Sequence, residues 1–176
     1  ENNASVQDLA GRFISIGQVG SGTEGLAKAA FAQLGIPINM ELARREGLRQ
    51  GIASLRKGTV DATCVVTGLG NPVVAEALSA GGIRLLSLPA AASAHAYPFA
   101  RTAVIPAGTY PVTPGFGLPK TDLPTIATDV VLACRAGLAT DDVLELTKAV
   151  HEGRASLAMA HPLLARISRP EEKAHL

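Results

Sequence analysis

The segment at residues 17–25, GQVGSGTEG, contains residue types at a spacing that could bind an anion. It joins the end of a predicted strand to the start of a predicted helix, where free backbone N–H groups and the helix dipole favour negative charge. The pattern Ser21-x-x-Glu24 also matches a capping box, in which Ser21 accepts from the backbone of residue 24 and Glu24 reaches back to residue 21. Capping leaves the Gly22 and Thr23 amides and the Thr23 hydroxyl for a carboxylate or phosphate. The predicted ligand contacts in this loop are Gly20, Ser21, Gly22 and Thr23.

A second polar loop, TGLGNP at residues 67–72, follows another predicted strand. In a parallel sheet with strand order 2-1-3 this loop would face the first one, because strand carboxyl ends meet at one edge. Thr67 and Asn71 are therefore further candidate ligand contacts. Asn71 stands directly before Pro72, however, so it is equally well explained as the N-cap of the next helix.

The glycines of the first loop also allow a rival interpretation. Gly20, Gly22 and Gly25 satisfy the G-x-G-x-x-G pattern of dinucleotide-binding loops, and Glu41 could bind a ribose at the end of the next predicted strand. Against this interpretation, the Glu24 charge lies where the pyrophosphate would pass, and short glycine patterns occur by chance. The Lys-Ser or Lys-Thr pair of a P-loop is also absent from this segment.

Patterns for catalysis or metal binding are missing from the sequence. Neither G-x-S-x-G nor H-E-x-x-H occurs, and the four histidines show no metal-ligand spacing with one another or with Cys64 and Cys134. We predict both cysteines to be buried, unpaired core residues, because each interrupts an apolar run; a disulfide between them is the alternative. The sequence thus predicts a protein that is not an enzyme and uses no metal or cofactor.

Composition excludes several function classes. The chain has 176 residues, and its 16 Lys and Arg nearly balance 15 Asp and Glu, giving a net charge of +1 that argues against general nucleic-acid binding. No apolar run reaches the roughly 18 to 20 residues that span a bilayer. A hydrophobic share of 47% with two Tyr, four Phe and no Trp predicts an aliphatic core. One basic cluster is predicted to be a solvated helix face; its members are Arg44, Arg45, Arg49, Arg56 and Lys57.

Hydrophobic periodicity predicts an α/β fold, a three-layer parallel sheet with helices on both faces. Strands are expected at residues 12–17, 38–42, 60–66 and 83–88, with helices over 24–34, from 48 to a stop at Gly58, and from Pro72 onward. The four strands should form one parallel sheet, because right-handed crossovers join adjacent parallel strands. That arrangement would place the loops at 20–24 and 67–71 side by side.

Proline and glycine dominate the next part of the chain, which we expect to be a connecting or hinge-like region up to Thr125. A further strand is predicted over 125–134, followed by a long helix that Thr140 caps and His161-Pro162 ends. The expected domains are a βαβ ligand-binding lobe at 1–100, a Pro/Gly-rich crossover with a returning strand at 101–139, and C-terminal helices at 140–176.

Several segments resemble the solute-binding receptors of TRAP transporters of the TAXI type, which have the type II periplasmic binding protein fold. The resemblance runs through DLAGRFISIGQVGSGTE (8–24), GTVDATCVVTGLGNP (58–72), IRLLSL (83–88), YPF (97–99), IPAGTYP (105–111) and TDDVLELTKAV (140–150). It implies a two-lobed clamp, periplasmic or otherwise extracytoplasmic, that holds a small organic anion, often glutamate-like or a dicarboxylate. It also implies a sodium-driven membrane permease as the partner that receives the ligand.

The resemblance corresponds to the second lobe plus returning helices, so one wall of the clamp is expected to come from elsewhere. A second chain supplying that lobe, an excised domain or a natural truncation would each explain the difference. The leading hypothesis is a non-enzymatic anion-binding lobe of a transport receptor that uses the loop at 20–23, with Asn71 and Tyr110 as further contacts. The alternatives are a nucleotide-binding domain of an oxidoreductase and an interaction module that has lost its ligand.

Overall fold

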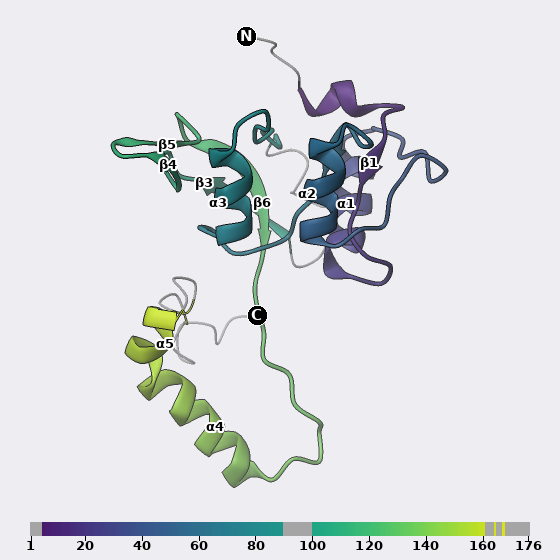
Figure 1. Ribbon diagram of the computed structural model, residues 1–176. Helices are drawn as coiled ribbons and strands as arrows, with labels where there is room; N and C mark the ends of the chain where they lie inside the picture. The colour runs from purple at the N-terminus through teal and green to yellow at the C-terminus, as the bar shows by residue number, and fades with distance from the viewer. Residues whose placement is uncertain (1–4, 90–99, 161–163, 165–166, 168–176) are drawn as a thin grey trace. The chain divides into compact units, whose positions relative to one another are not determined.

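The computed structural model describes residues 5–89, 100–160, 164 and 167, and the chain divides into two units, Glu1–Asp129 and Val130–Leu176 (Figure 1). Two parts of the sequence analysis lie outside the described residues: the YPF segment at 97–99 and the helix break at His161-Pro162. None of the described helices is long and apolar enough to cross a membrane.

The described part of the first unit contains short helices and short strands. In chain order these are the 3-10 helix η1 (Val6–Leu9), β1 (Ile14–Ser15), α1 (Gly22–Gln33), α2 (Leu48–Arg56), β2 (Ala62–Thr63), α3 (Pro72–Ser79), β3 (Ala100–Ile105), β4 (Tyr110–Thr113), β5 (Phe116–Leu118) and β6 (Leu123–Thr128).

A parallel strand pair lies at the centre of the N-terminal part. β1 pairs with β2 in the register Ile14 to Ala62, as the sequence predicts for the strands at 12–17 and 60–66. On the other edge of β1, the Arg44 N–H donates to the Ile14 carbonyl at 2.8 Å and the Arg44 carbonyl accepts from Ile16 at 2.9 Å. The chain at Arg44 therefore lies beside β1 on the edge opposite β2, but as an isolated bridge and not as the predicted second strand at 38–42.

Helices cover both faces of this strand pair. Ile14 and Ile16 point to one face and pack with Ala27 and Phe31 of α1 in a buried cluster. Ser15 points to the opposite face, where a Cβ on Gly51 of α2 would lie 3.0 Å from the Ser15 hydroxyl oxygen. The periodicity of Leu48, Ile52 and Leu55 predicts an apolar buried stripe on α2, but the buried face consists of Gly51 and Ser54.

The single four-stranded parallel sheet predicted from the sequence does not form. Residues 38–42 make a turn, because the Asn39 side chain accepts from the Glu41 N–H at 2.9 Å and the Asn39 carbonyl accepts from Leu42 and Ala43. Such local bonds compete with a strand ladder. Residues 83–88 also contain no strand, and the Leu88 N–H donates instead to the Pro124 carbonyl at 3.0 Å.

The Pro- and Gly-rich region is folded into antiparallel strands rather than a hinge. β3 pairs with β6 from Ala100 opposite Thr128 to Ile105 opposite Leu123, and β4 and β5 form a hairpin. Within the described residues each of these sheets has two strands, so a proline can face the edge away from the strand partner without breaking a ladder bond. β6 ends at Thr128, so the predicted strand over 125–134 begins earlier and ends sooner than expected.

The described part of the second unit contains two helices, α4 (Thr140–Glu152) and α5 (Arg154–Ala160), in place of one long predicted helix. Gly153 ends α4, and Ala139 rather than Thr140 is the N-cap. Cys134 is exposed, contrary to the prediction of a buried residue, because β6 ends before it is reached. Both cysteines are free, which confirms that they are unpaired.

Candidate ligand pocket at two helix N-termini

The first turn of α1 is capped by its own side chains. The Ser21 hydroxyl accepts from the Glu24 N–H at 3.2 Å, as the predicted capping box requires. The Glu24 carboxylate, however, accepts from the Gly20 N–H at 2.8 Å and not from residue 21. The Ser21 N–H is already used, since it donates to the Gln18 carbonyl at 3.0 Å.

Two cations hold the buried Glu24 carboxylate. Lys28 lies 2.8 Å away on the next turn of α1, and the Arg45 Nε lies 3.2 Å away. The hydrogen bond from Lys28 is the main cause that lowers the pKa of Glu24, followed by the one from the Gly20 backbone. The Glu24 charge is therefore compensated within the loop, which leaves the amides at the helix start free to attract an anion.

Glu24 should make the stability of the fold depend on acidity. Its pKa in the folded protein is lowered from 4.5, so its contribution is complete above pH 4.5 and is lost as the pH falls through the folded pKa. We expect Glu24→Gln to melt at a lower temperature than the wild type at neutral pH, and the difference to shrink on acidification below pH 4.5. Thermal melts recorded across this range measure it.

Glu41→Gln is the matched control, because the exposed Glu41 side chain has no hydrogen bond or ion pair in the described part of the chain. It should melt like the wild type throughout. A constant difference between Glu24→Gln and the wild type at every pH would contradict the assignment.

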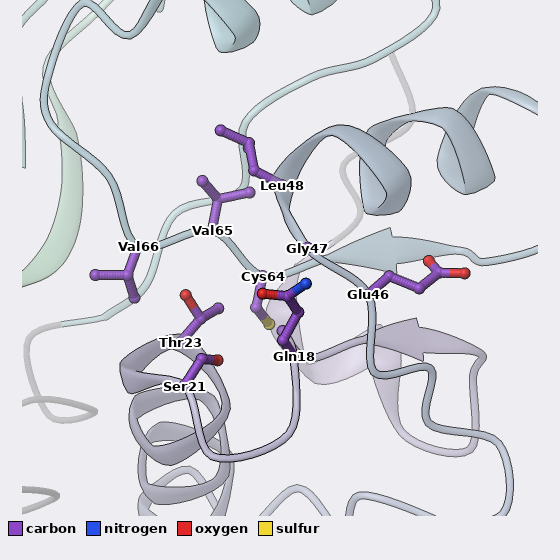
Figure 2. Close-up of a pocket in the computed structure, with 10 residues that line it drawn as sticks. Gln18, Ser21, Thr23, Glu46, Gly47, Leu48, Cys64, Val65 and Val66 are labelled. Carbon is purple, nitrogen blue, oxygen red and sulfur yellow. The ribbon is translucent and has the colours of Figure 1, made fainter.

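A pocket of about 110 Å³ opens beside this loop (Figure 2). Three segments form it: the loop before α1, the residues that begin α2 and the chain that leaves β2. The lining residues are Gly17, Gln18, Ser21, Thr23, Glu46, Gly47, Leu48, Cys64, Val65 and Val66. Figure 2 shows the Thr23 side chain directed toward Val65 and Val66 across the pocket.

The second helix to reach the pocket is α2. Its N-cap is Gly47, which offers no side chain to accept from the first-turn amides. The Gln18 side chain lies over this glycine, 3.3 Å from where a Cβ would be. The first N–H groups of a helix have no intrahelical acceptor, so both α1 and α2 present positive helix ends to one pocket.

The opposite wall is apolar. Leu48, Val65 and Val66 line it together with Cys64, which packs against the buried cluster below β1. Burial raises the pKa of the Cys64 thiol to about 12, so the thiol is neutral at physiological pH. A protonated, desolvated thiol is a poor nucleophile and metal ligand.

A family model described as the NMT1-like family matches residues 1–175. The chain belongs to the NMT1-like family. This family is periplasmic-binding-protein-like, and its members are substrate-binding proteins that are typically extracytoplasmic. No match to a curated protein was found. The mixed α/β fold of this NMT1-like protein is compatible with one lobe of such a binding protein.

The structure brings only part of the predicted site to the pocket of this NMT1-like protein. Ser21 and Thr23 line it, whereas Gly20, in the loop, and Gly22, the first residue of α1, are exposed and do not line it. The residues that sequence analysis missed come from the start of α2 and the end of β2. Gly47 before Leu48 could have been recognised in the sequence as an N-cap that leaves the first amides of α2 without a side-chain acceptor. Only the fold shows that the start of α2 lies at the same pocket as the start of α1.

The second predicted loop satisfies its own polar groups. The Asn71 amide donates to the Thr67 hydroxyl at 2.8 Å, and its oxygen accepts from the Val73 N–H at 2.9 Å. Tyr110 is 3% exposed and packs against Val74 and Leu78 of α3. Burial raises the pKa of Tyr110, against the effect of a backbone hydrogen bond from Gly70. None of these three predicted contacts lines the pocket.

We expect Asn71 to stabilise the fold as the N-cap of α3 and not to contact the ligand. Asn71→Ala is expected to lower the free energy of unfolding by about 1 kcal/mol, the usual cost of losing an N-cap. Urea denaturation measures this change. Asn71→Ser is the matched control, because its hydroxyl can still cap α3. Unchanged stability together with weaker ligand binding would instead assign Asn71 to the ligand.

All five residues of the basic cluster are exposed, as the prediction of a solvated face requires, but three of them also contact other parts of the chain. Arg45 pairs with Glu24, the Arg44 guanidinium lies 5.9 Å from the centre of the Phe13 ring, and Arg56 donates to the Ala77 carbonyl at 2.7 Å. Arg56 and Ala77 both line a second cavity, of about 240 Å³, between α2 and α3. These arginines therefore tie helices and loops together.

Proposed function

We propose that this NMT1-like protein is the solute-binding component of a TRAP transporter of the TAXI type, binding a small organic anion without catalysing a reaction. The observation that carries the proposal is the convergence of two helix N-termini on one pocket. Each helix end contributes roughly half a positive charge, so the pair favours one carboxylate without a lysine or arginine. Thr23 adds a hydroxyl donor that can orient it.

The chemistry of the lining supports binding without catalysis. The Cys64 thiol is neutral. The Glu46 carboxylate accepts from the Ser54 hydroxyl at 2.9 Å, and Figure 2 shows its side chain directed away from the other lining residues. Neither group is therefore arranged as a nucleophile or general base for a molecule in the pocket. The proposal requires no metal or cofactor.

The nucleotide-binding alternative has less support. Glu41, its ribose contact, belongs to the turn at 40–42 and not to the end of a strand. The pocket volume of about 110 Å³ also suits a small molecule better than a dinucleotide. We further propose that a membrane permease receives the ligand, that a second lobe from another chain completes the clamp, and that the protein works in the periplasm or another extracytoplasmic space.

Native mass spectrometry of the purified chain tests the proposal, because a bound small molecule survives gentle ionisation. We expect a retained or added carboxylate at one per chain. A retained nucleotide would support the oxidoreductase alternative, and no binding of any carboxylate at millimolar concentration would support the interaction module. Either of those results would overturn the receptor assignment.

A further inference from the structure

The two walls of the pocket differ in chemistry. Gln18, Ser21 and Thr23 form a polar wall at the start of α1. Leu48, Val65 and Val66 form an apolar wall across from it, as Figure 2 shows. A ligand that fills this space therefore meets hydrogen-bond donors at one end and hydrocarbon at the other.

Positive charge is confined to the helix ends. Among the described residues that line the pocket, none is Lys, Arg or His. The nearby cations Lys28 and Arg45 lie against the Glu24 carboxylate. A second carboxylate on the ligand would lose water on the side that faces Val65 and Val66 and would find no polar partner there. Burying an ionised group in this way is costly.

From the contrast between the walls we propose that the pocket selects a monocarboxylate with a short apolar tail over a dicarboxylate or glutamate. The carboxylate lies between the starts of α1 and α2, within reach of the Thr23 hydroxyl. The tail lies against Leu48, Val65 and Val66. This inference rests on the proposed function and narrows the glutamate-like or dicarboxylate ligand that the resemblance implies.

Calorimetric titration of the full chain with isovalerate, glutarate and glutamate tests the inference. Isovalerate should bind more tightly than either of the others by about tenfold or more, since they carry an additional charge to the apolar wall. Tighter binding of glutarate or glutamate would overturn the inference and leave the proposed function standing. No binding of any of the three carboxylates would count against the proposed function itself.

A second experiment places a positive charge on the apolar wall of the pocket. Val66 is 45% exposed, so Val66→Lys should fold normally and give a second carboxylate a partner. We expect this variant to reverse the preference, binding glutarate more tightly than isovalerate. Val104→Lys is the matched control, because Val104 is 48% exposed on β3 and does not line the pocket. An unchanged preference in a folded Val66→Lys protein would overturn the placement of the tail.

Discussion

Replacing Gly51 with alanine is expected to destabilise the protein by about 1 to 3 kcal/mol, the usual cost of overpacking a tight contact. A Cβ at this position would lie 2.5 Å from the Thr63 hydroxyl oxygen and 3.0 Å from that of Ser15. Alanine is otherwise the better helix former, by about 1 kcal/mol. The sign of the change measured by urea denaturation therefore shows which effect is larger. A more stable Gly51→Ala protein would mean that α2 does not approach the strands this closely.

Two further variants separate the clash from other effects of the substitution. In a Thr63→Ala background the nearest obstructing atom is gone, so Gly51→Ala should cost less there than in the wild type. Gly137→Ala is the matched control, because nothing lies within 4 Å of a Cβ at that position. Gly51→Ala should also weaken carboxylate binding, since displacing α2 moves Gly47 and Leu48 at the pocket.

Replacing Thr23 with alanine is expected to weaken carboxylate binding by about 1 to 3 kcal/mol, which is roughly 5- to 150-fold in the dissociation constant. A hydrogen bond from the Thr23 hydroxyl to a charged group explains this loss. Stability should fall by only a few tenths of a kcal/mol, because the hydroxyl forms no hydrogen bond with the described residues. Titration calorimetry with isovalerate and urea denaturation measure the two effects separately.

Thr23→Ser and Thr23→Val separate the contribution of the hydroxyl group to ligand affinity from that of the side-chain shape. Serine keeps the hydroxyl and should keep most of the affinity, whereas valine keeps the shape and should lose it. The methyl group packs close to Gly17, where a Cβ would lie 2.7 Å from Thr23 Cγ2. Equal affinity in the wild type, Thr23→Ala and Thr23→Val proteins would exclude this loop as the ligand contact. So would a dinucleotide that binds more tightly than every carboxylate.

Local sequence patterns gave correct predictions where the hydrogen bonds of a segment are made within that same segment. Ser21 and Asn71 are N-caps, as predicted, because each side chain needs only the amides of the next turn. The hydrophobic periodicity over 24–34 correctly indicated a helix, and its apolar residues Leu26, Ala30 and Phe31 form the buried face of α1. The same spacing failed for α2, because a close approach to two hydroxyl-bearing strand residues selected Gly51 for the buried face.

Strand predictions depended on partners that lie far away in the chain. The apolar residues at 38–42 and 83–88 have strand-like composition, but a local turn at Asn39 and the distant carbonyl of Pro124 determined their structure. The region before Thr125 shows the reverse error. Its prolines predicted a hinge, but strands formed there. Among the described residues each of these strands has one antiparallel strand partner, and a proline is tolerated where its missing N–H faces the other edge.

The sequence by itself determined the capped loop before α1, the helix boundaries near it and the parallel pairing of β1 with β2. These features depend on neighbouring residues or on strong apolar patterns. Only the tertiary structure decided that the start of α2 and the residues after β2 complete the pocket, and that Tyr110 is a core residue. The physical reason is that a pocket requires surfaces from separate segments, and their juxtaposition is fixed by packing contacts such as Gly51 against Thr63, which no local pattern encodes.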